Sequence, residues 1–341
     1  MLSAMSEAPP EVSVIIPTYN ATKYIREALD SILTQTFQDF EIVLVNDGCP
    51  DTAALERVLE PYQSRIRYIK QANKGVAGAR NTAIGAARAP LIFQMDPDDW
   101  LEPSCIEKEV RMMREHPEWD AVYCNSIQFA DSPEAALLWG ELVDRELMDF
   151  YPSLGPVSFC GVMESRTCPR NGGSITRREV LIRVGLYDEA LRSAEDLDMW
   201  LRILKADPPG KVGYTREPLM HYRLRADSLS MDAGLQQALL DALEKAGRLL
   251  DLTDEERECL ECRLAVNRFD VAVIQGRKAI NERRWKAAIR SFEYCQALRP
   301  SKKTQVTLAL LRVFPWVLPA GMSTWDWYLD RRRQRRDSQK Q

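Results

Sequence analysis

The chain has 341 residues, 45% apolar and 28% charged, which is the composition of a soluble globular protein of about two domains. Its formal net charge of −4 offers no basic field for binding nucleic acid. No signal peptide precedes the first strand, and no apolar run reaches the length of about 18 residues that spans a bilayer. We therefore expect a cytoplasmic protein without a nucleic-acid partner.

Strand and helix patterns alternate four times up to residue 95. Short β-branched or apolar runs predict strands at 12–17, 40–46, 66–70 and 91–95. Between these runs, apolar residues recur at the spacing of a helix, as in the segment from Ile25 to Leu33. The alternation predicts an α/β fold, a mostly parallel sheet with helices on both faces. Polar clusters follow all four strands, so they are expected to meet in one crevice at the carboxyl edge of the sheet.

The most informative of these clusters is the acidic turn after the fourth strand, which contains Asp96, Asp98 and Asp99. Clustered carboxylates repel one another in a partly dehydrated crevice unless a cation or hydrogen-bond donors neutralise them. Mg²⁺ and Mn²⁺ take a few carboxylates and complete their coordination with water and substrate phosphates. The turn thus indicates a metal that holds a nucleotide diphosphate, although an acidic turn that caps a helix is the simpler alternative.

Beyond the acidic turn, a further strand is predicted at 120–129, followed by an irregular region at 130–173 that we interpret as an excursion over the site. A helix with an apolar stripe begins near Glu195 and Asp196, whose charges suit the positive end of a helix. Two final strands are predicted at 211–215 and 217–225. The eight cysteines form no framework, and most are expected to be small core residues; the lone CxxC of Cys259 and Cys262 lacks two of the ligands of a structural zinc site.

The C-terminal third of the chain is predicted to be helical. Gly276, Ala288, Phe292 and Pro300 have the spacing of one tetratricopeptide-like helix pair, with a plain helical hairpin as the alternative. The last segment combines tryptophans with an arginine cluster and would either contact a membrane surface or pack on the protein as a strap. These features divide the chain into a domain at 11–230, a helical region at 231–305 and a tail at 306–341.

The ordered motifs of residues 12–230 resemble the family 2 glycosyltransferases, which are inverting enzymes with the GT-A fold. The matching stretches are VSVIIPTYN, SILTQTFQDFEIVLVNDGCPD, NKGVAGARNTAIGAA, LIFQMDPDDWLEP, GGSITRREVLIRVGLYDE, SAEDLDMWLRIL and HYRLRADSLS. The resemblance implies a set of nucleotide-binding residues: Pro17, Tyr19, Asn20, Asp47, Arg80, Asn81, Asp96 and Arg225. Asp47 would accept a hydrogen bond from the uracil imide. Arg225 stands where relatives often have a histidine, and it could clamp a phosphate but could not bind a metal.

The resemblance also implies the catalytic groups. Asp98 would bind Mn²⁺ or Mg²⁺, with Asp96 near the ribose and Asp99 as a further ligand. Asp196, or in its place Glu195, would act as the general base that takes the proton of the acceptor hydroxyl. The implied reaction transfers a sugar from a nucleotide-diphosphate sugar, a UDP-sugar in the first instance, to a saccharide or glycolipid of the cell envelope.

Two alternatives stay open at this point. A nucleotidyltransferase that makes the sugar donor would need a Gly-rich basic loop after the first strand, and TYNATKYI is not such a loop. A catalytically degenerate domain could instead serve as a binding scaffold. The C-terminal helices offer a surface for a protein partner or self-association, and the tail would allow peripheral binding at the inner face of the cell membrane.

Overall fold

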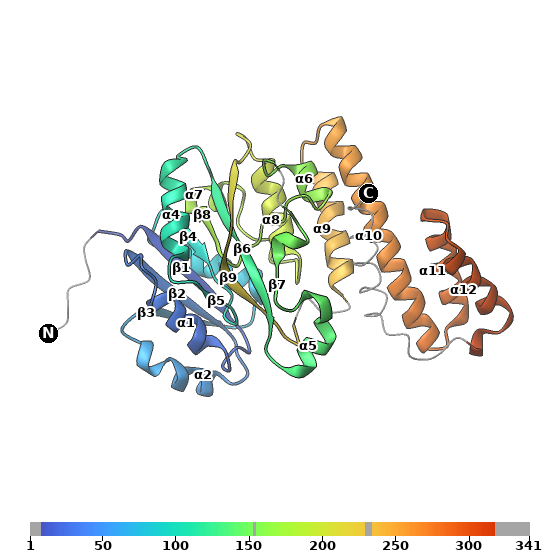
Figure 1. Ribbon diagram of the computed structural model, residues 1–341, viewed down its shortest axis with the longest axis horizontal. Coiled ribbons are helices and arrows are strands. Elements are labelled where there is room, and N and C mark those ends of the chain that lie inside the picture. The colour runs from blue at the N-terminus through green and yellow to red at the C-terminus, as the bar shows by residue number, and fades with distance from the viewer. Residues whose placement is uncertain (1–7, 153–154, 229–233, 318–341) are drawn as a thin grey trace.

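The computed structural model describes residues 8–152, 155–228 and 234–317. Their centre is a nine-stranded sheet with the order β3-β2-β1-β4-β8-β6-β9-β5, and β7 pairs with β6 (Figure 1). The strands are β1 Val12–Thr18, β2 Phe40–Asp47, β3 Ile66–Gln71, β4 Leu91–Gln94, β5 Trp100–Leu101, β6 Ala121–Ala130, β7 Arg145–Glu146, β8 Ser174–Arg177 and β9 Val212–Leu224. Strands β1 to β4 are mutually parallel, as the alternation of strands and helices predicts.

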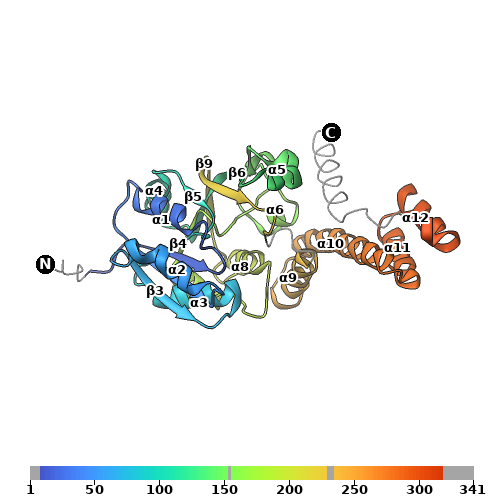
Figure 2. The same ribbon diagram turned by 90° about the horizontal axis from the view of Figure 1, so that it is seen from below.

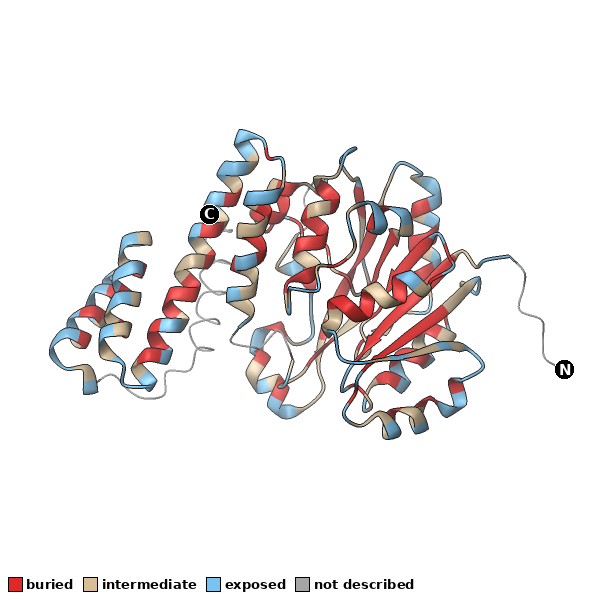
Figure 3. Ribbon diagram, turned by 180° about the vertical axis from the view of Figure 1, so that it is seen from behind, coloured by how far each residue is buried: buried red, intermediate tan, exposed pale blue. Residues whose placement is uncertain are grey.

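Helices cover both faces of the sheet, so the predicted fold class is confirmed. The helices are α1 Ile25–Leu33, α2 Thr52–Leu59, α3 Gly75–Ala86, α4 Cys105–Glu115, α5 Pro133–Trp139, α6 Phe159–Met163, α7 Arg178–Arg183, α8 Glu195–Leu204, α9 Leu235–Leu249, α10 Asp254–Asn281, α11 Trp285–Leu298 and α12 Lys302–Val313. Alternate residues of β1 enter different cores: Val14 and Ile16 pack with α1 and α4, whereas Ile15 packs with α3, α7 and α8. Strands β1, β2 and β4 are accordingly buried along almost their whole length, whereas β3 at the edge of the sheet is partly exposed (Figure 3).

The second half of the sheet differs from the prediction in two respects. Strand β8 lies antiparallel between β4 and β6, and these pairings give the sheet its mixed character. The two strands predicted at 211–215 and 217–225 are one strand, β9, whose register with β6 shifts near Pro218. A proline cannot donate a ladder hydrogen bond, and here the bulge accommodates it without ending the strand. The irregular region at 130–173 contains the short elements α5, β7 and α6.

Helices α9 to α12 extend from one side of the sheet domain (Figure 2). Thr253 and Glu256 form a reciprocal capping box at the start of α10. Gly276 of α10 allows close packing on α11, since a β-carbon there would lie 2.8 Å from Phe292. The tetratricopeptide character of this helix pair remains a prediction, and most of the tail at 306–341 lies outside the described residues. Within the described residues, no helix is both long and apolar enough to cross a membrane.

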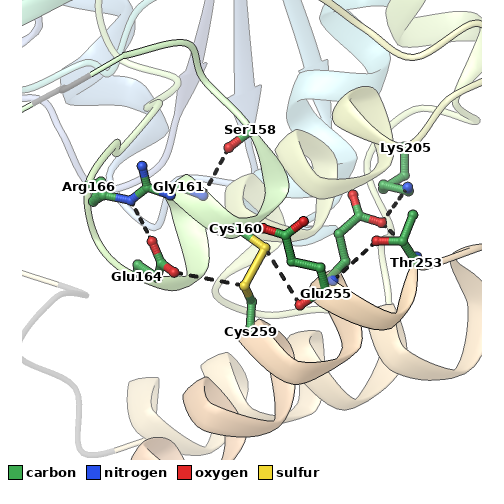
Figure 4. Close-up of a disulfide and its surroundings, with 10 residues drawn as sticks. Ser158, Cys160, Gly161, Glu164, Arg166, Lys205, Thr253, Glu255 and Cys259 are labelled. Carbon is green, nitrogen blue, oxygen red and sulfur yellow. Dashed lines mark hydrogen bonds and ion pairs between the residues drawn. A yellow bond between two sulfur atoms is a disulfide. The ribbon is translucent and has the colours of Figure 1, made fainter.

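A disulfide connects Cys160 of α6 with Cys259 of α10, across 99 residues of sequence and a Cα–Cα distance of 5.6 Å (Figure 4). The sequence analysis expects no cysteine framework and mostly core cysteines, and this pair departs from that expectation. The pairing depends on the docking of two distant helices, which residue spacing does not reveal. Cys262, the other member of the CxxC, is an exposed free thiol, whereas Cys49, Cys105, Cys124 and Cys295 are buried free thiols as predicted.

We expect Cys259→Ser to lower the free energy of unfolding by about 2–4 kcal/mol, because the disulfide restricts a long loop of the unfolded chain. Urea denaturation under non-reducing conditions would measure the loss. Cys262→Ser is the matched control, and an exposed substitution of this kind should change stability by less than about 0.5 kcal/mol. Equal stability of the two variants would show that the disulfide does not stabilise the protein.

Candidate functional site

The carboxyl ends of β1, β2 and β4 carry predicted site residues to one edge of the sheet. Pro17 is buried within β1, whereas Tyr19 is half exposed and Asn20 has a left-handed backbone with φ of 51°. A left-handed conformation is uncommon outside glycine, and such backbone strain is concentrated at functional sites. The polar ends of these strands thus form a shared, partly open surface.

At the end of β2, Asp47 accepts hydrogen bonds from the protein at one of its two carboxylate oxygens, Oδ1. Its Oδ1 accepts hydrogen bonds from Gln71 Nε2 at 2.7 Å and from the Lys74 backbone N–H at 2.9 Å. The residue is 2% exposed. Two donors therefore fix the carboxylate, while Oδ2 is not engaged by either of them and can accept a further donor.

Arg80 of α3 connects two acidic segments that are far apart in the sequence. Its Nη2 lies 2.9 Å from Asp96 Oδ1, and its Nη1 lies 2.5 Å from Glu195 Oε1. The arginine is 4% exposed, and both carboxylates raise its pKa against the opposing effect of burial. The fixed fork of a guanidinium suits such a double contact. Arg80 thereby holds the acidic turn beside the first turn of α8.

The start of α8 presents Glu195 and Asp196 differently. Burial raises the pKa of Glu195, the Arg80 charge opposes this shift, and Asp196 adds to it. Asp196 is partly exposed, and its Oδ1 accepts the N–H of Leu197 at 2.7 Å. The preceding Ala194 has a left-handed backbone with φ of 60°. Glu195 is therefore bound to Arg80, whereas Asp196 remains the accessible acid of the pair.

The acidic turn concentrates negative charge in a poorly hydrated place. Burial, and then the neighbouring Asp96, raise the pKa of Asp98 to about 6, although Arg225 lowers it. Burial also raises the pKa of Asp99 well above its usual value, and its Oδ2 has no hydrogen-bond partner. Oxygen donors of this kind fit a hard divalent cation, which would relieve the repulsion.

Arg223 of β9 and Arg225, directly after this strand, already offset part of this charge. Arg225 Nη1 lies 3.1 Å from Asp98 Oδ2, and its Nε lies 3.1 Å from Asp227. Arg223 donates its backbone N–H to Asp99 Oδ1 at 2.8 Å and its Nε–H to the Asp98 carbonyl at 2.6 Å. The sequence analysis missed Arg223; the repeat of arginine two residues apart on one predicted strand was the available signal.

Asn81 makes contacts of a different kind from those of Arg80. Its Nδ2 donates to the carbonyl of Tyr187 at 2.9 Å and to Glu189 at 3.0 Å, and its Oδ1 accepts the N–H of Tyr187. The amide thus fixes the 187–189 loop beneath Arg80, whose guanidinium lies 5.5 Å from the Tyr187 ring. His221 is a packed residue, stacked on Trp100 with ring centroids 3.4 Å apart.

The sheet, its covering helices and the acids at its carboxyl edge define a protein of the GT-A class. Two solved structures share this fold. TarS of S. aureus, in complex with UDP-GlcNAc, has a TM-score of 0.62 and 19% identity, covering 89% of this chain and 87% of that chain. The mannosyltransferase PcManGT of Pyrobaculum calidifontis, in complex with GDP-Man and Mn²⁺, has a TM-score of 0.61 and 18% identity over 94% and 85% of the two chains.

The family model described as glycosyl transferase family 2 matches residues 13–163. The glycosyltransferase GlyA of Streptococcus pneumoniae is 36% identical over 70% of this chain and 34% of its own length. An uncharacterised glycosyltransferase of Rickettsia typhi is 28% identical over 72% of this chain and 74% of its own. A Rickettsia felis relative is 30% identical, but the match spans 32% of its length. Together these matches show that the chain is similar to glycosyltransferases, and over residues 13–163 to the family 2 model.

Proposed function

We propose that the protein is a metal-dependent inverting glycosyltransferase that transfers a sugar from a UDP-sugar to a hydroxyl of a saccharide or glycolipid. The observation that carries the proposal is the double contact of Arg80, which places Asp96 and the acidic turn beside the Glu195–Asp196 pair. Metal-binding and base residues of an inverting transferase must flank one sugar, and this arrangement brings them together. The donor complexes of TarS and PcManGT support a nucleotide sugar.

In this proposal, Asp196 takes the proton of the acceptor hydroxyl while that oxygen forms its bond to the anomeric carbon. The bond between the anomeric carbon and the diphosphate oxygen breaks in the same step, and the nucleotide diphosphate leaves with the electron pair. Asp98, with Asp96 and Asp99, would hold Mn²⁺ or Mg²⁺, which when bound stabilises the charge of the leaving diphosphate. Glu195 stays paired with Arg80 and keeps α8 in place.

In this proposal, the donor nucleotide binds at the ends of β1 and β2, where it contacts Pro17, Tyr19 and Asn20. Asp47 Oδ2 would accept the uracil imide proton, while Gln71 and Lys74 keep the carboxylate in position. Arg225 contacts Asp98 and is close enough to exchange this carboxylate for a phosphate oxygen of the donor. Arg80 already pairs with two carboxylates. In this proposal it therefore positions the acids around the diphosphate rather than binding the diphosphate itself.

The acceptor belongs, in our proposal, to cell-envelope polysaccharide biosynthesis, with a hexosyl or N-acetylhexosaminyl group as the sugar transferred. The C-terminal helices would bind a protein partner or a second copy, and the tail would contact the inner face of the membrane. Large apolar side chains are exposed where α12 ends, namely Val313, Phe314 and Trp316. Such a surface supports an interfacial role for this end of the chain.

The test is calorimetric titration of nucleoside diphosphates and triphosphates with and without Mn²⁺. We expect UDP to bind tightly only with the metal, and Asp98→Asn to weaken this binding by at least about 100-fold, since a neutral amide is a poor ligand for a hard cation. Glu102→Gln is the control, because the Glu102 carboxylate lies outside the acidic turn, where its Oε1 is 2.8 Å from His221 Nε2. Preference for a nucleoside triphosphate would indicate a nucleotidyltransferase instead.

A further inference from the structure

Buried polar atoms without hydrogen-bond partners occur on the acidic turn, on β6 and in the segment 167–171. They are Asp99 Oδ2, Ser126 Oγ, Gln128 Nε2, Thr167 Oγ1, and both Asn171 Oδ1 and Nδ2. Each of these residues is at most 4% exposed. A buried polar group left unpaired is unfavourable, so such groups near a proposed site indicate a place that a polar ligand can complete.

Two of these residues, Ser126 and Gln128, lie on β6 where it pairs with β9. Ser126 and Gln128 alternate with Ile127 and so point to the same face of the sheet, and they pair with Met220 and Tyr222 of β9. The segment before β8 contacts Met220 and Tyr222. Arg170 Cζ is 4.9 Å from the Tyr222 ring, and a β-carbon on Gly172 would lie 2.7 Å from Met220 Cε. Arg170 and Asn171 thus cover the β6–β9 surface.

Arg170 differs from the other arginines at this edge of the sheet. Arg223 pairs with Glu27, and Arg225 pairs with Asp98 and Asp227. Among residues 8–152, 155–228 and 234–317, no carboxylate forms an ion pair with Arg170, which stacks on Tyr222 and hydrogen-bonds the side chain of Cys168. A partly buried guanidinium without a carboxylate in direct contact can bind an anion.

The segment that carries Arg170 lies between the two groups of acids. A β-carbon on Gly172 would lie 3.5 Å from Asp96 Oδ2, and the Arg170 charge acts to lower the pKa of Asp99. Two residues before Arg170, the charge of Asp196 acts to raise the pKa of Cys168. The segment that contains Arg170 and Gly172 therefore lies against the acidic turn.

We infer that Arg170, Asn171, Ser126 and Gln128 form the acceptor subsite, and that the acceptor carries a phosphate or carboxylate group, which Arg170 binds. This inference rests on the proposed transferase function. The strand order favours the acceptor over the donor as the molecule that carries the anion. The nucleotide is proposed to bind at β1 and β2, whereas β6 and β9 lie beyond β4 and β8 in the sheet. The amide of Asn171 and the polar groups of β6 would bind sugar hydroxyls.

The test compares glucose, glucose 6-phosphate and glucuronate as calorimetric ligands of the full chain, with and without UDP and Mn²⁺. We expect at least one anionic sugar to bind about 10-fold or more tightly than glucose. Arg170→Gln should abolish this preference, and Arg170→Lys should retain part of it. Arg166→Gln is the matched control, because Arg166 is exposed and pairs with Glu164 in the same segment.

The outcomes separate this inference from the proposed function. If Arg170→Gln weakens UDP binding and leaves sugar binding unchanged, the anion belongs to the donor and the inference is wrong. Equal binding of glucose and both anionic sugars by the wild-type protein would also overturn it. If UDP fails to bind but the Arg170-dependent preference for an anionic sugar persists, the proposed donor is wrong and the anion subsite stands. Circular dichroism of each variant would establish that it is folded.

Discussion

Asp196→Asn is expected to reduce the turnover of sugar transfer by about 10³-fold while leaving the affinity for UDP almost unchanged. The amide has nearly the shape of the carboxylate but cannot take a proton from the acceptor, and general base catalysis contributes about 10²–10⁴-fold to a rate. Glu195 pairs with Arg80, which contacts the acidic turn, whereas Asp196 accepts the N–H of Leu197, so donor binding should survive the loss of the Asp196 charge. Initial rates with saturating donor, together with calorimetry of UDP, would measure both quantities.

The control for this variant is Asp254→Asn. Asp254 also lies in the first turn of a helix, at the start of α10, and is exposed to solvent. Any general effect of removing a carboxylate from a helix N-terminus would appear in both variants. Near-normal turnover of Asp196→Asn would exclude it as the base, and Glu195 would then need testing in its place.

Arg80→Ala is expected to lower the free energy of unfolding by about 3–5 kcal/mol, because it leaves two poorly hydrated carboxylates without their counter-charge. Urea denaturation at neutral pH would measure the loss. The difference from the wild-type protein should narrow as the pH falls, since burial raises the pKa of Glu195 and its protonation removes an unpaired charge. Arg80→Lys keeps the charge but not the fork of two nitrogens, so its loss should be smaller.

Arg88→Ala provides the comparison for an ordinary ion pair. Arg88 Nε lies 2.8 Å from Glu41 Oε2 and its side chain is 40% exposed. Solvent-exposed pairs of this kind contribute about 0–1 kcal/mol. A loss no larger for Arg80→Ala than for Arg88→Ala would mean that the bridge between Asp96 and Glu195 does not hold the site together.

Most of the sheet's first half could be predicted from the sequence because its signals are local. Each of β1 to β4 is a short apolar run with a polar stop, and each crossover helix has its own apolar stripe. The position of Asp47 and Asp96 at the carboxyl edge then follows from the general behaviour of parallel sheets.

The second half could not be predicted in the same way because its contacts are long-range. The insertion of β8 between β4 and β6, and the salt bridge between Arg80 and Glu195 across 115 residues, depend on how distant segments dock. The same holds for Arg170 and Asn171, which belong to a stretch without periodicity. Their importance becomes visible only when β6 and β9 are placed beneath them.

The Cys160–Cys259 crosslink bears on how this protein can be shortened. The segment that carries Arg170 is secured at one end by β8 and at the other by α6, and α6 is covalently attached to α10. A truncation after β9 would therefore remove helices α9 to α12, and it would also release α6, which anchors one end of this segment, from its covalent attachment. A minimal fragment that keeps this segment anchored must extend past residue 259.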